Sequence, residues 1–111
     1  MSWRLMGMIF SARIGDLKDQ AGNVTRASTA KMVLLCLANH VNDEGTGAYP
    51  GLTRMQQLTH LSRPTIVNAY DALRFNGYIT LMGKTRYNTN EYRINFRTLL
   101  IPPEEEDSQA T

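Results

Sequence analysis

The clearest pattern of hydrophobic and polar positions lies between Leu52 and Ile79. It predicts a short helix, a tight turn and a second helix that begins at Ser62. The apolar positions of the second helix recur at helical spacing and predict one buried stripe, formed by Ile66, Ala69, Tyr70 and Leu73. The opposite face is expected to be the outer one, and it carries Pro64, Val67, Asn68, Asp71 and Phe75.

Local signals mark both ends of this second helix. Ser62 can accept a hydrogen bond from a free backbone N–H at the start, and Pro64 lies in the first turn, where a missing N–H costs little. Asn76-Gly77 ends the helix, because glycine accepts the left-handed conformation that a helix end often needs. Two helices joined by a minimal turn, the second with a small polar outer face, are typical of a helix-turn-helix that reads DNA.

A more apolar helix is expected before this pair. Residues 32–38 and Val41 are apolar on nearly every side, which predicts a central core helix that runs from a cap at Ser28 or Thr29 to about Val41. Within it, Cys36 is interpreted as a small core residue rather than a nucleophile. His40 is interpreted as a cap of the helix C-terminus.

Alternating β-forming residues follow the helix pair. Residues 78–82 and 90–96 predict two strands, with Ile79 and Leu81 on one face of the first. Tyr92, Ile94 and Phe96 share one face of the second strand. The connecting loop, residues 83–89, contains several cationic or hydrogen-bonding side chains and predicts a β-hairpin with a cationic tip. Upstream, residues 42–47 are a turn by composition, and residues 48–50 predict a short edge strand.

The two ends of the chain are less patterned. In residues 1–27 an apolar start is followed by polar residues and glycines, which leaves two alternatives: a strand or helix that packs on the domain, or an arm that pairs two protomers. Residues 98–111 include Pro102-Pro103 followed by an acidic, polar run and are expected to be disordered. That acidic tail is a linker, a competitor of DNA for a basic surface, or a segment without function. The main domain is therefore predicted to span residues 28–97.

Composition narrows the classes of protein. A chain of 111 residues suggests one domain. No apolar run is long enough to cross a membrane, and the N-terminus lacks the features of a secretory signal. The single Cys36 excludes an internal disulfide and fits a reducing cytoplasm.

The net charge of +2 conceals an asymmetry. Four of the ten acidic residues lie in the tail, at Glu104–Asp107, whereas Thr53–Arg97 holds seven basic residues and two acidic ones. Basic residues that coincide with the predicted helix pair and hairpin favour a polyanion as partner.

The run MQQLTHLSRPTI, Met55–Ile66, resembles the helix-turn-helix of winged-helix DNA-binding proteins, in which Leu-Ser-Arg-Pro-Thr and a hydrophobic residue open the recognition helix. Gln56 stands where that pattern has a small residue, and His60 stands where it has glycine. The resemblance covers residues 30–95 and is closest to a group found in phage and plasmid replication proteins and mobile-element regulators. Two further runs carry it, Lys31–Ala38 and Asn42–Gly45.

The resemblance implies a mainly α fold with a small β-hairpin, that is, an α+β winged helix-turn-helix, and double-stranded DNA as the partner. An α-helix fits the major groove of B-DNA, so its outer side chains lie against base edges. The residues expected to read bases are Arg63, Thr65, Val67, Asn68 and Asp71. The residues expected to bind backbone phosphates are Ser62, Thr53, Arg54, Arg74, Lys84, Arg86 and Tyr87.

Phe75 is an unusual residue for the outer face of a recognition helix. We expect it to pack under the N-terminal segment or against a second copy, so a homodimer through that segment and Phe75 is one prediction. Two half-sites would then multiply sequence discrimination.

Other function classes fit less well. A protein-interaction module or a holder of single strands is the alternative to duplex binding, because the five tyrosines could stack on bases. An enzyme is not expected, since Cys36, His40 and His60 form no nucleophile constellation with a placed carboxylate. No cofactor loop and no zinc-ligand spacing is present, and residues 42–47 lack the further oxygen ligands of a calcium loop.

Overall fold

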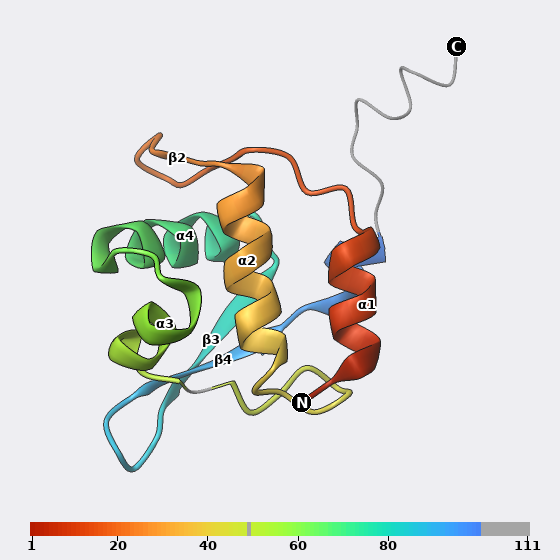
Figure 1. The fold of residues 1–111 in the computed structure, drawn as a ribbon, viewed down its shortest axis with the longest axis vertical. Coiled ribbons are helices and arrows are strands. Elements are labelled where there is room, and N and C mark those ends of the chain that lie inside the picture. Colours follow the sequence, from red (N-terminus) through yellow and green to blue (C-terminus); the bar gives the residue numbers. More distant parts are fainter. Residues whose placement is uncertain (49, 101–111) are drawn as a thin grey trace.

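The computed structural model describes residues 1–48 and 50–100. Helices pack on both sides of a central helix, and a long β-hairpin projects beyond them (Figure 1). The elements are α1 Trp3–Ser11, β1 Leu17–Lys18, β2 Val24–Thr25, α2 Ala27–Ala38, α3 Leu52–Thr59, α4 Arg63–Phe75, β3 Ile79–Lys84, β4 Asn90–Ile94 and α5 Phe96–Leu100. This mixed fold, mainly helical with the β3–β4 hairpin directly after the α3–α4 pair, confirms the predicted α+β fold class.

Helix α2 forms the centre of the core, as its apolar sequence predicted. Val33, Leu34 and Leu37 are fully buried, and the helix contacts α1, α3 and α4. Both of its ends differ from the prediction, and the C-terminal end lies at Ala38 rather than near Val41. His40 caps the C-terminus as expected, with its Nδ1 2.8 Å from the Cys36 carbonyl oxygen.

The predicted N-cap of α2 is wrong. The helix begins at Ala27, after Arg26, so neither Ser28 nor Thr29 is its cap. The Ala27 amide instead donates to the Asp16 carboxylate at 2.9 Å. A carboxylate at this position satisfies a free amide and complements the positive end of the helix.

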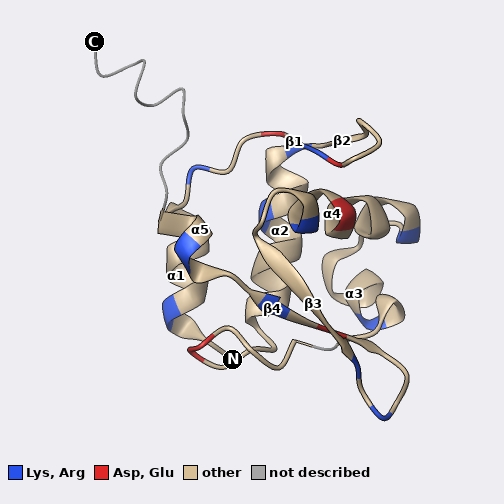
Figure 2. Ribbon diagram, turned by 180° about the vertical axis from the view of Figure 1, so that it is seen from behind, with Lys and Arg blue, Asp and Glu red and all other residues tan. Residues whose placement is uncertain are grey.

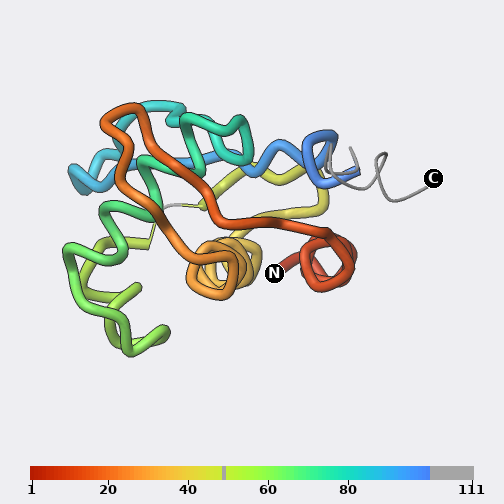
Figure 3. The backbone as a smooth tube through the Cα atoms, turned by 90° about the horizontal axis from the view of Figure 1, so that it is seen from above, coloured from red at the N-terminus to blue at the C-terminus, as the bar shows by residue number. Residues whose placement is uncertain are grey.

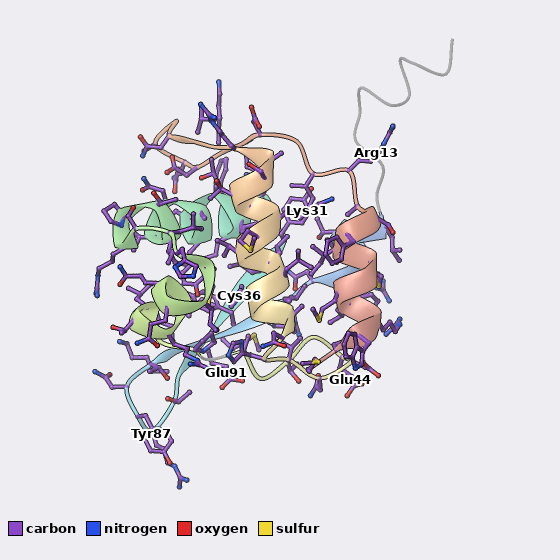
Figure 4. The ribbon with its side chains drawn as sticks, in the orientation of Figure 1. Arg13, Lys31, Cys36, Glu44, Tyr87 and Glu91 are labelled. Carbon is purple, nitrogen blue, oxygen red and sulfur yellow. The ribbon has the colours of Figure 1, made fainter. Side chains whose placement is uncertain are left out.

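The N-terminal segment folds as a helix that packs on the domain, which was the first of the two alternatives. Leu5 and Ile9 of α1 are fully buried. The hydroxyl of Ser2 accepts from the Leu5 amide at 3.1 Å and donates to Asp43 at 2.9 Å. At the other end, Lys31 Nζ of α2 donates to the Phe10 and Ala12 carbonyl oxygens. Figure 4 labels the Lys31 side chain, which lies between α2 and α1.

A small hairpin, β1–β2, follows α1 in the segment where the sequence has polar residues and glycines. Leu17 pairs with Thr25 and Lys18 with Val24. The Asp19 carboxylate accepts from the amides of Ala21 and Asn23 and thereby closes the turn. Asn76, just after α4, donates to the Lys18 carbonyl oxygen at 2.9 Å and fastens the hairpin to that helix.

The β3–β4 hairpin is antiparallel, with Ile79 opposite Ile94 and an irregularity between Leu81 and Gly83. The second strand ends at Ile94, so its predicted extension to Phe96 is wrong. Phe96 instead opens α5, which continues to Leu100 and buries Leu99. The ordered chain therefore passes the predicted start of the tail at residue 98; residues 101–111, with the acidic run, lie outside the described residues.

The predicted turn at residues 42–47 is present and docks on β4. Ile94 N–H donates to the Gly45 carbonyl oxygen at 2.8 Å. Gly45 has φ +86°, and an added Cβ would lie 2.5 Å from the Ile94 carbonyl oxygen, so only glycine fits there. Of the predicted edge strand, Ala48 forms an isolated bridge with Tyr92, and Tyr49 lies outside the described residues.

Candidate nucleic-acid interface

The turn between α3 and α4 is short and locally determined. His60 ends α3 in the left-handed conformation, with φ 59° and ψ 21°, and its amide donates to Gln56 at 2.9 Å. Ser62 is the N-cap of α4, as predicted, and Pro64 lies in the first turn. The histidine thus adopts a left-handed backbone conformation, which glycine commonly adopts at helix ends.

The two faces of α4 are those that the sequence predicted. Its inner stripe, Ile66, Ala69, Tyr70 and Leu73, is buried. The predicted outer residues are all exposed, and they are Pro64, Val67, Asn68, Asp71 and Phe75. Gly77, at φ +82°, follows the end of the helix. The exposed face of the helix is therefore mixed, with the polar Asn68 and Asp71 beside the apolar Val67 and Phe75.

The loop of the β3–β4 hairpin, which we call the wing (residues 83–89), is held by its own hydrogen bonds. The Thr85 amide donates to Thr89 at 2.8 Å, and the two threonine hydroxyls lie 2.8 Å apart. At the tip, the Arg86 guanidinium lies 5.2 Å from the centre of the Tyr87 ring. Tyr87 is 71% exposed and points away from the body of the protein (Figure 4). The tip is thus a preformed cationic and aromatic surface.

Helices α3 and α4 and the wing border a common groove of about 490 Å³, which we call the reader groove. Six residues predicted for DNA contact line it: Thr53, Arg63, Val67, Asp71, Arg74 and Lys84. Asn88 and Asn90 also line it but were missing from the predicted site. Their signal in the sequence was their position in or next to the hairpin loop, where polar side chains are common.

The N-terminus of α3 opens into the reader groove. Pro50, Gly51, Leu52 and Thr53 all line the groove. Gly51 is the N-cap and has no side chain to accept from the first-turn amides. Helix N-termini with such amides favour anions, because the N–H groups and the helix dipole both carry partial positive charge.

The other predicted contact residues lie outside the groove lining. Asn68 is exposed on α4, Arg54 is exposed on α3, and Arg86 and Tyr87 lie at the wing tip. The Ser62 hydroxyl accepts from the Thr65 amide at 3.3 Å and donates to Thr65 Oγ1 at 2.8 Å. Its predicted role as the cap is confirmed, while its phosphate contact stays a prediction.

Phe75 lies in a second recess, beside the turn of the β1–β2 hairpin and β3. Gln20 and Ala21 line this recess with it, but Phe75 remains 60% exposed. The N-terminal segment therefore approaches Phe75 without covering it. Asp71 and Arg74 line both this recess and the reader groove.

Charge is distributed unevenly over these surfaces. Basic residues occur at both ends of α4 and along the wing, with Asp71 between them on α4 (Figure 2). Basic residues are also present on α1 and α5, so the asymmetry is moderate. Within the described ranges no group of three or more His, Cys, Asp or Glu could hold a metal ion, and none of the helices there is both long and apolar enough to span a membrane.

Tyr70, which lines the reader groove, and Cys36 both have raised pKa values. Burial raises the pKa of Tyr70, and the nearby Tyr92 and Cys36 act in the same direction. The Tyr70 hydroxyl is buried and has no hydrogen-bond partner, while its ring packs on Tyr92 with centroids 4.8 Å apart. Burial also raises the pKa of Cys36, which Arg54 partly opposes. Cys36 packs against the core, as predicted.

One of three comparisons with known proteins supports a helix-turn-helix arrangement. Neither the curated proteins nor the solved structures gave a match. A family model described as a helix-turn-helix domain matches residues 28–79. That range runs from the start of α2 through the α3–α4 pair to the first residue of β3. Over residues 28–79, just under half of the chain, this protein is therefore similar to helix-turn-helix domains.

Proposed function

We propose that this protein binds double-stranded DNA with sequence preference, with α4 in the major groove and the wing on the backbone. One observation carries the proposal: the outer face of α4, the N-terminus of α3 and the wing border a single groove with Arg63, Arg74 and Lys84 on its walls. An exposed helix that carries a cation at each end, with a further cation on the neighbouring wing, matches the shape and charge of a duplex.

Base reading is assigned to the exposed side chains of α4. Asn68 makes paired hydrogen bonds to adenine, and Arg63 bridges the O6 and N7 atoms of guanine. Val67 contacts a thymine methyl group, and Asp71 accepts from cytosine. Thr65 keeps its own hydroxyl proton, because it accepts rather than donates in its bond with Ser62; it can therefore donate to a base acceptor.

Backbone binding is assigned to the cations and amides around that helix. Lys84 and Arg86 of the wing, with Arg54 and Arg74, neutralise phosphates, and Tyr87 and Thr53 donate hydrogen bonds. The uncapped first turn of α3 adds main-chain donors at the same edge. These contacts set the position and affinity of the protein without reading sequence.

The biological setting is proposed from resemblance. The Lys31–Ala38 and Asn42–Gly45 runs are similar to those of phage and plasmid replication proteins and mobile-element regulators, so we propose replication initiation or transcriptional regulation in a bacterial cytoplasm. Both runs also have structural tasks here, since Lys31 caps α1 and Gly45 docks on β4. Recognition chemistry is the same for the two roles.

Selection of bound fragments from a random pool of duplex DNA, followed by footprinting, tests the proposal. We expect enrichment of one motif and protection centred on a major groove. Competition with the matching single strand separates duplex reading from the alternative of a single-strand holder. The proposal is wrong if no motif is enriched, or if the single strand displaces the duplex at equal concentration.

A further inference from the structure

Helix α1 carries an exposed apolar stripe on the face that points away from the core. Trp3 is 76% exposed and Phe10 is 66% exposed, and exposed Gly7 lies between them at helical spacing. Leu5 and Ile9 on the opposite face are fully buried. Large aromatic side chains are usually among the more buried residues, so two of them on one outer stripe indicate an interaction surface.

Gly7 is the middle residue of this nine-residue helix, and the fold of the protomer does not account for it. A Cβ added at Gly7 would meet nothing within 4 Å, and its φ is not in the left-handed region. Glycine inside a helix is less favourable than alanine because more backbone entropy is lost. A glycine at an exposed helix centre instead allows the close approach of another backbone.

The stripe is free of charge. The helix has no acidic residue, and Arg4 is its only basic one. The Arg4 guanidinium lies 5.6 Å from the centre of the Phe96 ring, and its Nη1 donates to the Asp43 carbonyl oxygen at 3.3 Å. These two contacts hold the charge on the flank of the helix, beside its own domain.

We propose that a second copy of this chain covers the stripe, with the two α1 helices antiparallel about a two-fold axis at Gly7. Trp3 and Phe10 lie four residues before and three residues after Gly7. Antiparallel pairing therefore places Trp3 of each protomer near Phe10 of the other, with the two glycines at the crossing point. A two-fold interface must be self-complementary in this way, and the stripe meets that condition.

The available area predicts a weak dimer. If a large aromatic side chain buries roughly 200 Å², the exposed parts of Trp3 and Phe10 offer roughly 280 Å² per protomer. The area that two protomers bury together is then smaller than the roughly 1,200 Å² at which stable interfaces begin. A membrane surface is a poorer occupant, because interfacial helices carry several cations on their polar face and α1 carries only Arg4.

The location of the stripe is compatible with a dimer that still binds a partner through α4. Helix α2 lies between α1 and the α3–α4 pair, as both Figure 1 and Figure 3 show. Pairing through α1 therefore leaves the reader groove of each protomer open. The inference does not depend on DNA binding, and the experiment uses the free protein.

Trp3 is the only tryptophan of the chain, so its emission reports directly on the stripe. We expect sedimentation to show a monomer–dimer equilibrium between micromolar and submillimolar concentrations, and the Trp3 emission to shift to the blue over the same range. Gly7→Glu places two carboxylates at the crossing point, and we expect it to weaken dimerisation about a hundred-fold or more, since like charges facing each other are strongly unfavourable. Gly15→Glu is the matched control, because Gly15 also has nothing within 4 Å of an added Cβ.

Each outcome decides the proposal. It is supported if the wild type and the Gly15→Glu variant dimerise with a blue shift, while the Gly7→Glu variant stays monomeric and at least as stable to heat. It is overturned if the wild type is monomeric throughout with emission typical of an exposed indole. Dimers of the Gly7→Glu variant as tight as those of the wild type, or open-ended association instead of dimers, would also overturn it.

Discussion

Replacing Lys84 and Arg86 of the wing together by alanine tests the assigned backbone contacts. Both side chains are exposed on a hairpin whose turn is held by Thr85 and Thr89 rather than by either cation. Surface substitutions of this kind change the free energy of unfolding by about 0.5 kcal/mol or less. A change in DNA binding would therefore report lost contacts and not unfolding.

The expected magnitude follows from counterion release. Each neutralised phosphate contributes about −0.9 to the slope of log affinity against log salt concentration, so the double variant should have a slope shallower by about 1.8. Between about 50 and about 200 mM salt, the wild type should lose about 12-fold more affinity than the variant. Fluorescence anisotropy with a labelled duplex at several salt concentrations measures both slopes.

A second double variant, with Arg13 and Arg97 replaced by alanine, is the matched control. It removes the same net charge from two exposed positions next to α1 and in α5. We expect its salt slope to equal that of the wild type. An unchanged slope in the wing variant would refute the assignment of the wing to the backbone, and an equal decrease in both variants would show a general charge effect.

Three further substitutions test single residues. Asn68→Ala should cost about 1–3 kcal/mol at one base position and relax the preference there; repeated selection measures this, and an unchanged motif would contradict it. Tyr70→Phe should raise the free energy of unfolding by about 1 kcal/mol at neutral pH, because the unpartnered hydroxyl is removed. Burial raises the pKa of Tyr70, so unfolding releases its proton above pH of about 10. The wild type should therefore lose stability there by about 1.4 kcal/mol per pH unit more than the variant. Parallel urea titrations of the two proteins measure this difference, and equal pH dependences would contradict it. Gly45→Ala should destabilise by roughly 2 kcal/mol or more, since its φ is positive and its Cβ would clash with Ile94, and an unchanged melting temperature would exclude that clash.

The helix pair could be predicted because its signals are local. The stripe of Ile66, Ala69, Tyr70 and Leu73 has helical period, the Ser62 cap acts on an amide three residues away, and Gly77 follows the helix end. Each of these interactions lies within a few residues of the chain. The exposure of the five outer residues of α4 follows from the same period.

The features that were missed depend on distant contacts. Helix α2 is capped by Asp16, eleven residues before Ala27, and α1 is capped by Lys31, about twenty residues after its end. The β1–β2 hairpin has strands of two residues, too short for an alternating pattern. The membership of Asn88 and Asn90 in the reader groove depends on how the wing is placed against α4, which no local pattern encodes.

Amide chemical-shift mapping with a labelled protein and a short duplex of the selected sequence tests the central claim most directly. The account predicts saturable shifts concentrated on the outer face of α4, the first turn of α3 and residues 83–89 of the wing. Changes at α1 should be small, because α2 separates that helix from the reader groove. Shifts that concentrate on α1 and α5, or that do not saturate with added duplex, would contradict the account.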